Sequence, residues 1–131
     1  MSALLPAAVG ALCFMLLDGL WLGLVAARFY REQLAVIGRI EDGRFVPNWA
    51  AAFAVYVLLG AGLALLAAPR ASSIGSAAAH GALFGLIVYG VYDFTNLATL
   101  RHYPVQLALV DVAWGTAASA LGTIAVWTAA R

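Results

Sequence analysis

The chain has 131 residues, of which 65% are hydrophobic and 10% charged, and its net charge is +1. A soluble domain carries about 45–50% apolar and about 25% charged residues, so the composition predicts an integral membrane protein. The small net charge argues against a nucleic-acid-binding protein, which would show a basic face. The single cysteine, Cys13, excludes an intrachain disulfide and a thiolate zinc cluster. We predict no metal site and no cofactor.

Four apolar runs predict four transmembrane helices, at about residues 3–27, 48–68, 77–100 and 104–129. Each run has the length of about 20 residues that a helix needs to cross the hydrocarbon layer, and none alternates like a barrel strand. The first run lacks a basic leader and carries Asp18, so we interpret it as a membrane span and not as a signal peptide. The sequence therefore predicts an all-α integral membrane four-helix bundle, forming one transmembrane domain.

The connection between the first two runs is the one sizeable polar segment. Tyr30, Leu34 and Ile37 recur at helical spacing, which predicts a short amphipathic helix lying on the membrane. The turn residues Asp42 and Gly43 are expected to end it. A solvated loop with helical fragments is an equal alternative.

The arginines predict the orientation of the chain in the membrane. Two connections on one side hold most of them, namely Arg28, Arg31, Arg39, Arg44 and Arg101. The opposite side holds only Arg70 and Arg131. Because basic residues gather in cytoplasmic connections, we expect the N- and C-termini to lie outside, in the periplasm.

Small residues four positions apart predict close helix contacts, inside one protomer or between protomers. These pairs are Gly19–Gly23, Gly81–Gly85 and Gly115–Ser119.

Three acidic residues fall inside the apolar runs: Asp18, Asp93 and Asp111. A carboxylate that faces lipid costs at least a few kcal/mol, so these side chains are expected to face the interior of the bundle. Counted from the cytoplasmic ends of their helices at 1.5 Å per residue, they lie about 15, 12 and 10 Å deep. The spacing thus places all three in one layer of the cytoplasmic half.

Each acid has a polar or aromatic companion three residues later, and further polar groups share the same faces or the same side of the membrane. Together these side chains predict a polar pocket below the cytoplasmic surface. Its predicted residues are Asp18, Trp21, Asn48, Tyr89, Tyr92, Asp93, Asn96, Asp111 and Trp114.

The four runs contain no Lys or Arg, so the acids lack a neutralising partner at their own depth. Arg28 and Arg101 are candidates to reach down from the interface, because long basic side chains bridge such distances. Otherwise at least one carboxyl is expected to be protonated at neutral pH, or to bind a cation or a basic ligand.

The run Tyr89–Leu100 resembles the signature of a small bacterial family of predicted four-helix membrane proteins, domain of unknown function family 2177. The Asp18-x-x-Trp21 element and the run Asp111–Gly115 match two further marks of that family. Phe94 stands where the family usually has leucine. The resemblance covers nearly the whole chain and implies a bacterial inner-membrane protein, without an established activity.

Three functions remain open at this point. We favour a small binding or transport module whose carboxylate pocket takes a proton, a cation or a small molecule from the cytoplasm; it would need a homo-oligomer or a partner membrane subunit to make a complete path. The first alternative is a membrane enzyme or enzyme subunit acting on a lipid or fatty-acyl substrate, with an aspartate as general acid or base. The second is a structural partner protein, whose acids only fix helix packing. Membrane lipid is the expected surrounding partner, and nucleic acid is not expected.

Overall fold

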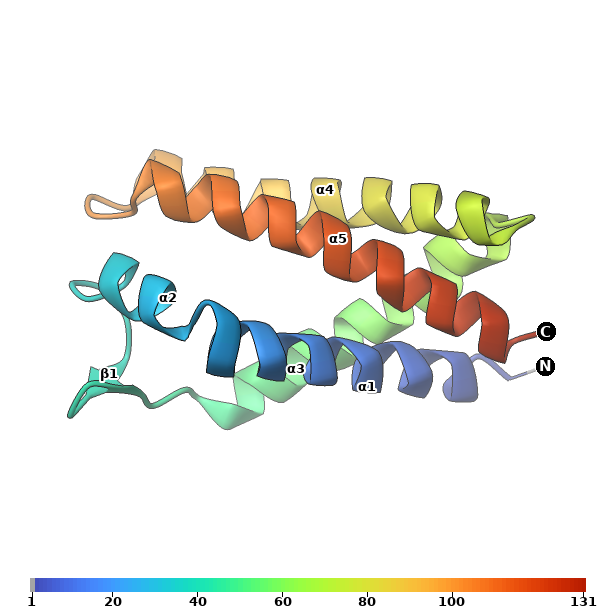
Figure 1. The fold of residues 1–131 in the computed structure, drawn as a ribbon, viewed down its shortest axis with the longest axis horizontal. Coiled ribbons are helices and arrows are strands. Elements are labelled where there is room, and N and C mark those ends of the chain that lie inside the picture. Colours follow the sequence, from blue (N-terminus) through green and yellow to red (C-terminus); the bar gives the residue numbers. More distant parts are fainter. Residues whose placement is uncertain (1) are drawn as a thin grey trace.

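A computed structural model describes residues 2–131 of the chain. Among these residues, four helical segments are long and apolar enough to cross a membrane, Leu4–Val25, Trp49–Arg70, Ile74–Thr99 and Val105–Ala129. They run side by side along the long axis of the molecule, with both termini at one end (Figure 1). The predicted all-α four-helix architecture is confirmed.

Two of the four segments contain irregular turns. The first is α1 (Leu4–Leu20) followed by a π-helical turn, η1 (Trp21–Val25). The second is α3 (Trp49–Gly62), a π-helical turn η2 (Leu63–Ala67) and a 3₁₀ turn η3 (Ala68–Arg70). The third and fourth are α4 (Ile74–Thr99) and α5 (Val105–Ala129). Ser73 caps α4 by accepting a hydrogen bond from the backbone N–H of Ser76 at 3.0 Å, so this helix begins earlier than predicted.

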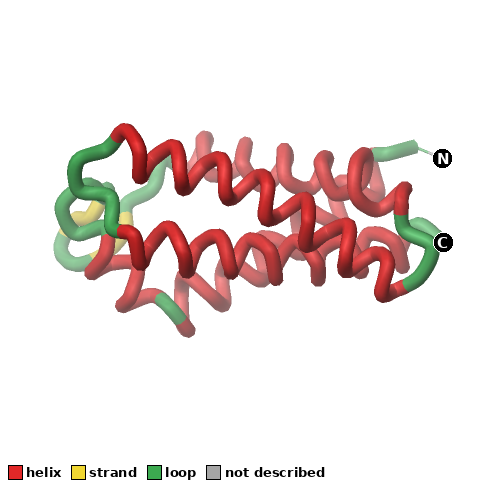
Figure 2. Tube along the Cα trace, turned by 90° about the horizontal axis from the view of Figure 1, so that it is seen from above, coloured by secondary structure: helices red, strands yellow, loops and turns green. Residues whose placement is uncertain are grey.

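The connection after the first segment differs from the predicted surface helix. Helix α2 (Ala27–Gln33) ends before Ile37, and a two-stranded hairpin follows, with strands β1 (Ile40–Glu41) and β2 (Arg44–Phe45). Asp42 and Gly43 do form a turn, with φ of 50° and 74°, but it joins two strands. Tyr30 is only 5% exposed, so it points into the bundle and not along the membrane surface. The loops and strands of this connection lie at the end opposite the termini (Figure 2).

Helices α4 and α5 pack so closely that added methyl groups would collide with the facing helix. A Cβ atom on Gly81 or Gly85 would strike the backbone of α5, and one on Gly115 would strike the ring of Tyr89. The contacts advance in four-residue steps, in opposite directions along the two antiparallel helices. The facing pairs are Gly81 with Thr123, Gly85 with Ser119, and Tyr89 with Gly115.

The glycine pair of the first segment does not pack inside this protomer, which was one of the two predicted alternatives. Gly19 and Gly23 have no neighbour within 4 Å of the position where a Cβ would stand, so they make no helix contact inside this protomer. Instead α1 approaches α3 through Gly10 and Gly60. The same four-residue spacing of glycines therefore marks a packing face in α4 but borders open space in the first segment.

Two apolar core clusters divide the bundle along its length. The larger lies toward the termini and includes Phe14, Leu63 and Val126, all at 0% exposure. The smaller lies at the opposite end and includes Tyr30, Tyr103 and Leu107. Along their helices, Asp18, Asp93 and Asp111 fall between these clusters.

The α4–α5 contact predicts a sharp difference between two glycines of the same helix. Gly85→Ala should lower the free energy of unfolding in detergent by about 1–3 kcal/mol, as over-packing does, because the new methyl group meets the Gly115 carbonyl. Gly75→Ala should be neutral or stabilising by about 0.5–1 kcal/mol, since no atom lies closer than 3.9 Å. Thermal unfolding followed by circular dichroism measures both, and equal stabilities would contradict the packing described here.

Candidate functional site

Asp18 joins three helices through two hydrogen bonds. Its carboxylate accepts one from the hydroxyl of Tyr56 on α3 at 2.8 Å and one from the indole Nε1 of Trp114 on α5 at 2.7 Å. Each donor reaches a different carboxylate oxygen. Two neutral donors thus hold this acid in place inside the bundle.

Asp111 is held by a side chain from the polar connection. The hydroxyl of Tyr30 donates to Asp111 Oδ1 at 2.8 Å and accepts from the indole Nε1 of Trp21 at 3.1 Å. The ring of Trp21 stacks on that of Trp114, with centroids 4.6 Å apart and an interplanar angle of 4°. The stacked indoles therefore connect the surroundings of Asp18 to those of Asp111.

Asp93 is the most deeply enclosed of the three acids, with 0% exposure. The hydroxyl of Tyr103, in the loop between α4 and α5, donates to its Oδ1 at 2.5 Å. The carboxyl of Asp111 is its other close polar neighbour. The three acids thus belong to one network, in which Asp93 lies behind Asp111.

The remaining predicted residues divide into neighbours of this network and one that does not join it. Asn96 lies beside the hydroxyls of Tyr92 and Tyr103. Tyr89 packs its ring on Gly115. Asn48, in contrast, caps α3 by accepting from the backbone N–H of Ala51 at 3.2 Å.

Sequence reasoning missed the donors Tyr30, Tyr56 and Tyr103. Tyr30 and Tyr103 occupy connections, where an aromatic residue indicates the membrane interface. Tyr30 reaches Asp111 only because the π-helical turn η1 ends in a bend, after which α2 lies across the end of the bundle (Figure 1). No periodicity in the sequence encodes that path.

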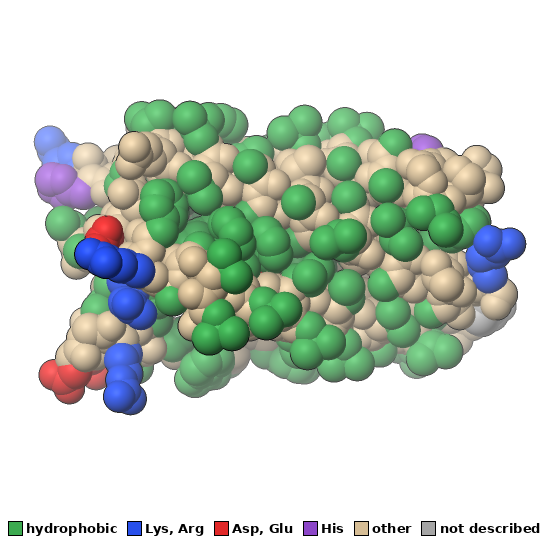
Figure 3. All heavy atoms as spheres, viewed as in Figure 1, with side chains coloured by type: hydrophobic (Ala, Val, Ile, Leu, Met, Phe, Trp, Pro, Cys, Tyr) green, Lys and Arg blue, Asp and Glu red, His purple; other side chains and the backbone are tan. Residues whose placement is uncertain are grey.

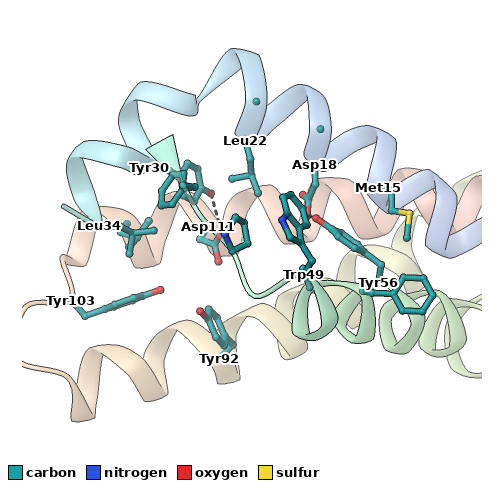
Figure 4. A pocket seen from close by; sticks show the side chains of 17 residues that line it. Met15, Asp18, Leu22, Tyr30, Leu34, Trp49, Tyr56, Tyr92, Tyr103 and Asp111 are labelled. Carbon is teal, nitrogen blue, oxygen red and sulfur yellow. Dashed lines mark hydrogen bonds between the residues drawn. The ribbon is translucent and has the colours of Figure 1, made fainter. Parts of the chain in front are cut away.

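A cavity of about 830 Å³ lies beside the network. Figure 4 shows its side chains gathered from the first segment, α2, α3, α4 and α5. The polar lining residues are Asp18, Tyr30, Tyr56, Tyr92, Tyr103 and Asp111. Much of the remaining wall is apolar and includes Met15, Leu22, Leu34, Phe45, Phe53 and Leu107. Gly19 and Gly23 also line it, so the open space beside α1 belongs to this cavity.

No basic side chain compensates the acids. Within residues 2–131 the one ion pair joins Arg28 to Glu32 at 2.8 Å, and both side chains are exposed. Arg28 therefore does not reach down to the acids, as one interpretation of the sequence allowed. In the same described part of the chain, no cluster of His, Cys, Asp and Glu is arranged to hold a metal ion.

The two tyrosines at the polar end stay hydrogen-bond donors at physiological pH. Burial, reinforced by the neighbouring acids, raises the pKa of Tyr30 and that of Tyr103 well above the ordinary tyrosine value. Each hydroxyl keeps its proton and can stabilise negative charge on the carboxyl it contacts.

The fold and the network define a multi-pass α-helical membrane protein with a carboxyl-containing polar cluster between its helices. The chain belongs to the family described as "Predicted membrane protein (DUF2177)", whose sequence profile matches residues 4–128. No curated protein and no solved structure matches it.

The Tyr30 hydroxyl is expected to stabilise the fold through its two hydrogen bonds. Tyr30→Phe leaves Asp111 without this donor and Trp21 without its acceptor, and should lower the free energy of unfolding by about 1–3 kcal/mol. Tyr92→Phe is the matched control, because Tyr92 is 59% exposed, and should change stability by less than about 0.5 kcal/mol. Both are measured by thermal unfolding in detergent, and an unaffected Tyr30→Phe protein would contradict the network.

Proposed function

We propose that this protein is a small binding module of the bacterial inner membrane, which takes up a small molecule with an apolar body and a basic group from the cytoplasmic side. The supporting observation is the cavity of about 830 Å³, whose largely apolar wall contains two carboxyls and no basic side chain. Ligand sites are mostly apolar clefts of roughly 300–1,000 Å³ with a few placed polar groups, and the cavity has this character.

The charge of the cavity supports a basic ligand group. Asp18 and Asp111 contact neutral donors, which orient a carboxylate but do not neutralise it. An isolated negative charge away from water is costly, whereas a cation bound beside it recovers much of that cost. An organic amine matches these acids better than a metal ion does, because much of the wall around them is apolar.

The rim of the cavity supports an apolar ligand body. Leu22, Trp49 and Phe53 line the cavity and are also exposed on the outer surface, at 37%, 74% and 61%. These residues lie in membrane-spanning segments, so the same side chains border the lipid. An alkyl chain can therefore pass between the bilayer and the cavity without crossing a polar surface.

Binding explains the geometry better than the two alternative functions do. Both oxygens of Asp18 already accept hydrogen bonds, which suits a fixed acceptor more than a mobile acid or base. A purely structural cluster would be packed to the density of a protein interior and would leave no cavity of this size.

Binding also explains the geometry better than conduction through one protomer. The core cluster around Phe14, Leu63 and Val126 is fully buried and fills the half of the bundle toward the termini. The cavity lies in the other half, so transport would require rearrangement, a second copy of the chain or a partner membrane subunit.

We infer that the end carrying α2 and the hairpin faces the cytoplasm and that both termini lie in the periplasm. Basic side chains gather at the α2 end (Figure 3). Arg28 and Arg31 belong to α2, and Arg44 belongs to β2. Fusion of a reporter active only in the periplasm to residue 131 should give signal, and the same reporter inserted after Gly43 should not. The reverse pattern would overturn the orientation and, with it, the cytoplasmic entry.

Filling the cavity should abolish binding without unfolding the protein. Gly19→Leu places a side chain in open space inside the cavity, whereas Gly75→Leu adds the same group outside its lining. The probe is a long-chain alkylamine with a dansyl group at the far end of its chain, detected by energy transfer from tryptophan in detergent. We expect Gly19→Leu to weaken binding at least about tenfold, or about 1.4 kcal/mol, and Gly75→Leu to bind like the parent.

The same assay tests the role of charge. An alkyl carboxylate with the same label should bind about tenfold more weakly than the amine. Its negative charge is repelled by the carboxyls of the cavity, and no basic side chain of the lining attracts it. Asp111→Asn keeps an oxygen that accepts from Tyr30 but removes the charge, so the preference for the amine should shrink. Equal binding of the two probes to the parent protein would refute the proposal.

A further inference from the structure

The contact between α4 and α5 determines how Asp93 and Asp111 face each other. Its four-residue steps pair Gly85 with Ser119 and then Tyr89 with Gly115. The next step along both helices brings Asp93 opposite Asp111. The close backbone approach at the glycines therefore brings the two carboxyls together inside the bundle.

One buried oxygen of this pair has no hydrogen-bond donor among the described residues. Asp93 Oδ1 accepts from Tyr103, but Asp93 Oδ2 is buried and has no partner among the described residues. A buried acceptor without a donor costs about 1–3 kcal/mol, and more when it is charged. Two adjacent carboxylates would add the repulsion of like charges. A proton on Oδ2 removes both costs, because it can be donated to Asp111.

The surroundings supply no other cation. The titratable groups that face the pair from the packed elements are Tyr103, Tyr92, Tyr89, Tyr30 and Asp18. Four of them are neutral hydroxyls, and the fifth is a further acid. No basic side chain within residues 2–131 forms an ion pair with either member.

We propose that Asp93 and Asp111 form a buried proton-binding site that holds one proton between the two carboxyls. Asp93 carries the proton, because it is at 0% exposure and does not line the cavity. Asp111 keeps the negative charge, because it lines the cavity and accepts a hydrogen bond from Tyr30. The site thus stores a proton directly behind the charge presented to the cavity, whether or not an amine is the ligand.

Infrared spectroscopy of the detergent-solubilised protein tests this site without any ligand. At neutral pH the parent protein should show the carbonyl stretch of a protonated carboxylic acid, which shifts on exchange into D2O. The band should be lost in Asp93→Asn and retained in Asp18→Asn, the matched removal of another acid of the network. Circular dichroism establishes that each variant is folded. A parent spectrum without this band, or a band that survives in folded Asp93→Asn, would overturn the proposal.

A second variant keeps both acids and so does not depend on the folding of Asp93→Asn. Tyr103→Phe removes the donor to Asp93 Oδ1, which is the carbonyl oxygen when Oδ2 carries the proton. The band should then remain but move to higher frequency, because the carbonyl loses a hydrogen bond. Tyr56→Phe removes a comparable hydroxyl from Asp18 and should leave the frequency unchanged. An unchanged frequency in Tyr103→Phe would contradict the assignment to Asp93.

Discussion

A carboxyl group inside a bilayer must find its partners within the protein, because lipid offers none. The fold meets this requirement with the hydroxyls of Tyr30, Tyr56 and Tyr103 and the indoles of Trp21 and Trp114. These partners come from η1, α2, α3, α5 and the loop between α4 and α5. The arrangement of the helices around the cavity therefore follows from the need to satisfy three acids, and not from apolar packing alone.

The two Asp-x-x-Trp elements show how the acids couple the helices. Trp114 donates to Asp18 on a different helix and not to the neighbouring Asp111, while Trp21 reaches Asp111 through Tyr30. The two indoles stack on each other, and this contact holds the two sets of hydrogen bonds in place. In each element the aspartate accepts a hydrogen bond from another segment, and the tryptophan donates one to another segment. Neither element can therefore form its hydrogen bonds on its own.

The sequence predicts the four helices and the depth of the acids, because apolar length and rise per residue are local properties. It does not predict the donors, since Tyr30 depends on a π-helical turn and on the path of α2 across the end of the bundle. It also cannot distinguish Gly81–Gly85, which packs against α5, from Gly19–Gly23, which lines a cavity. The spacing is identical, and only the position of the facing helix decides the outcome.

The close contact of α4 and α5 and the open space beside α1 have complementary consequences. Without side chains at Gly81 and Gly85, the backbones approach until Asp93 lies opposite Asp111, and Asp93 is fully buried. Without side chains at Gly19 and Gly23, the other face of Asp111 borders a cavity. Asp111 thus lies between the buried carboxyl of Asp93 and the cavity. A change of charge in the cavity must therefore alter the electrostatic energy of the carboxyl pair, and the reverse also holds. The low dielectric of the interior screens such charges poorly.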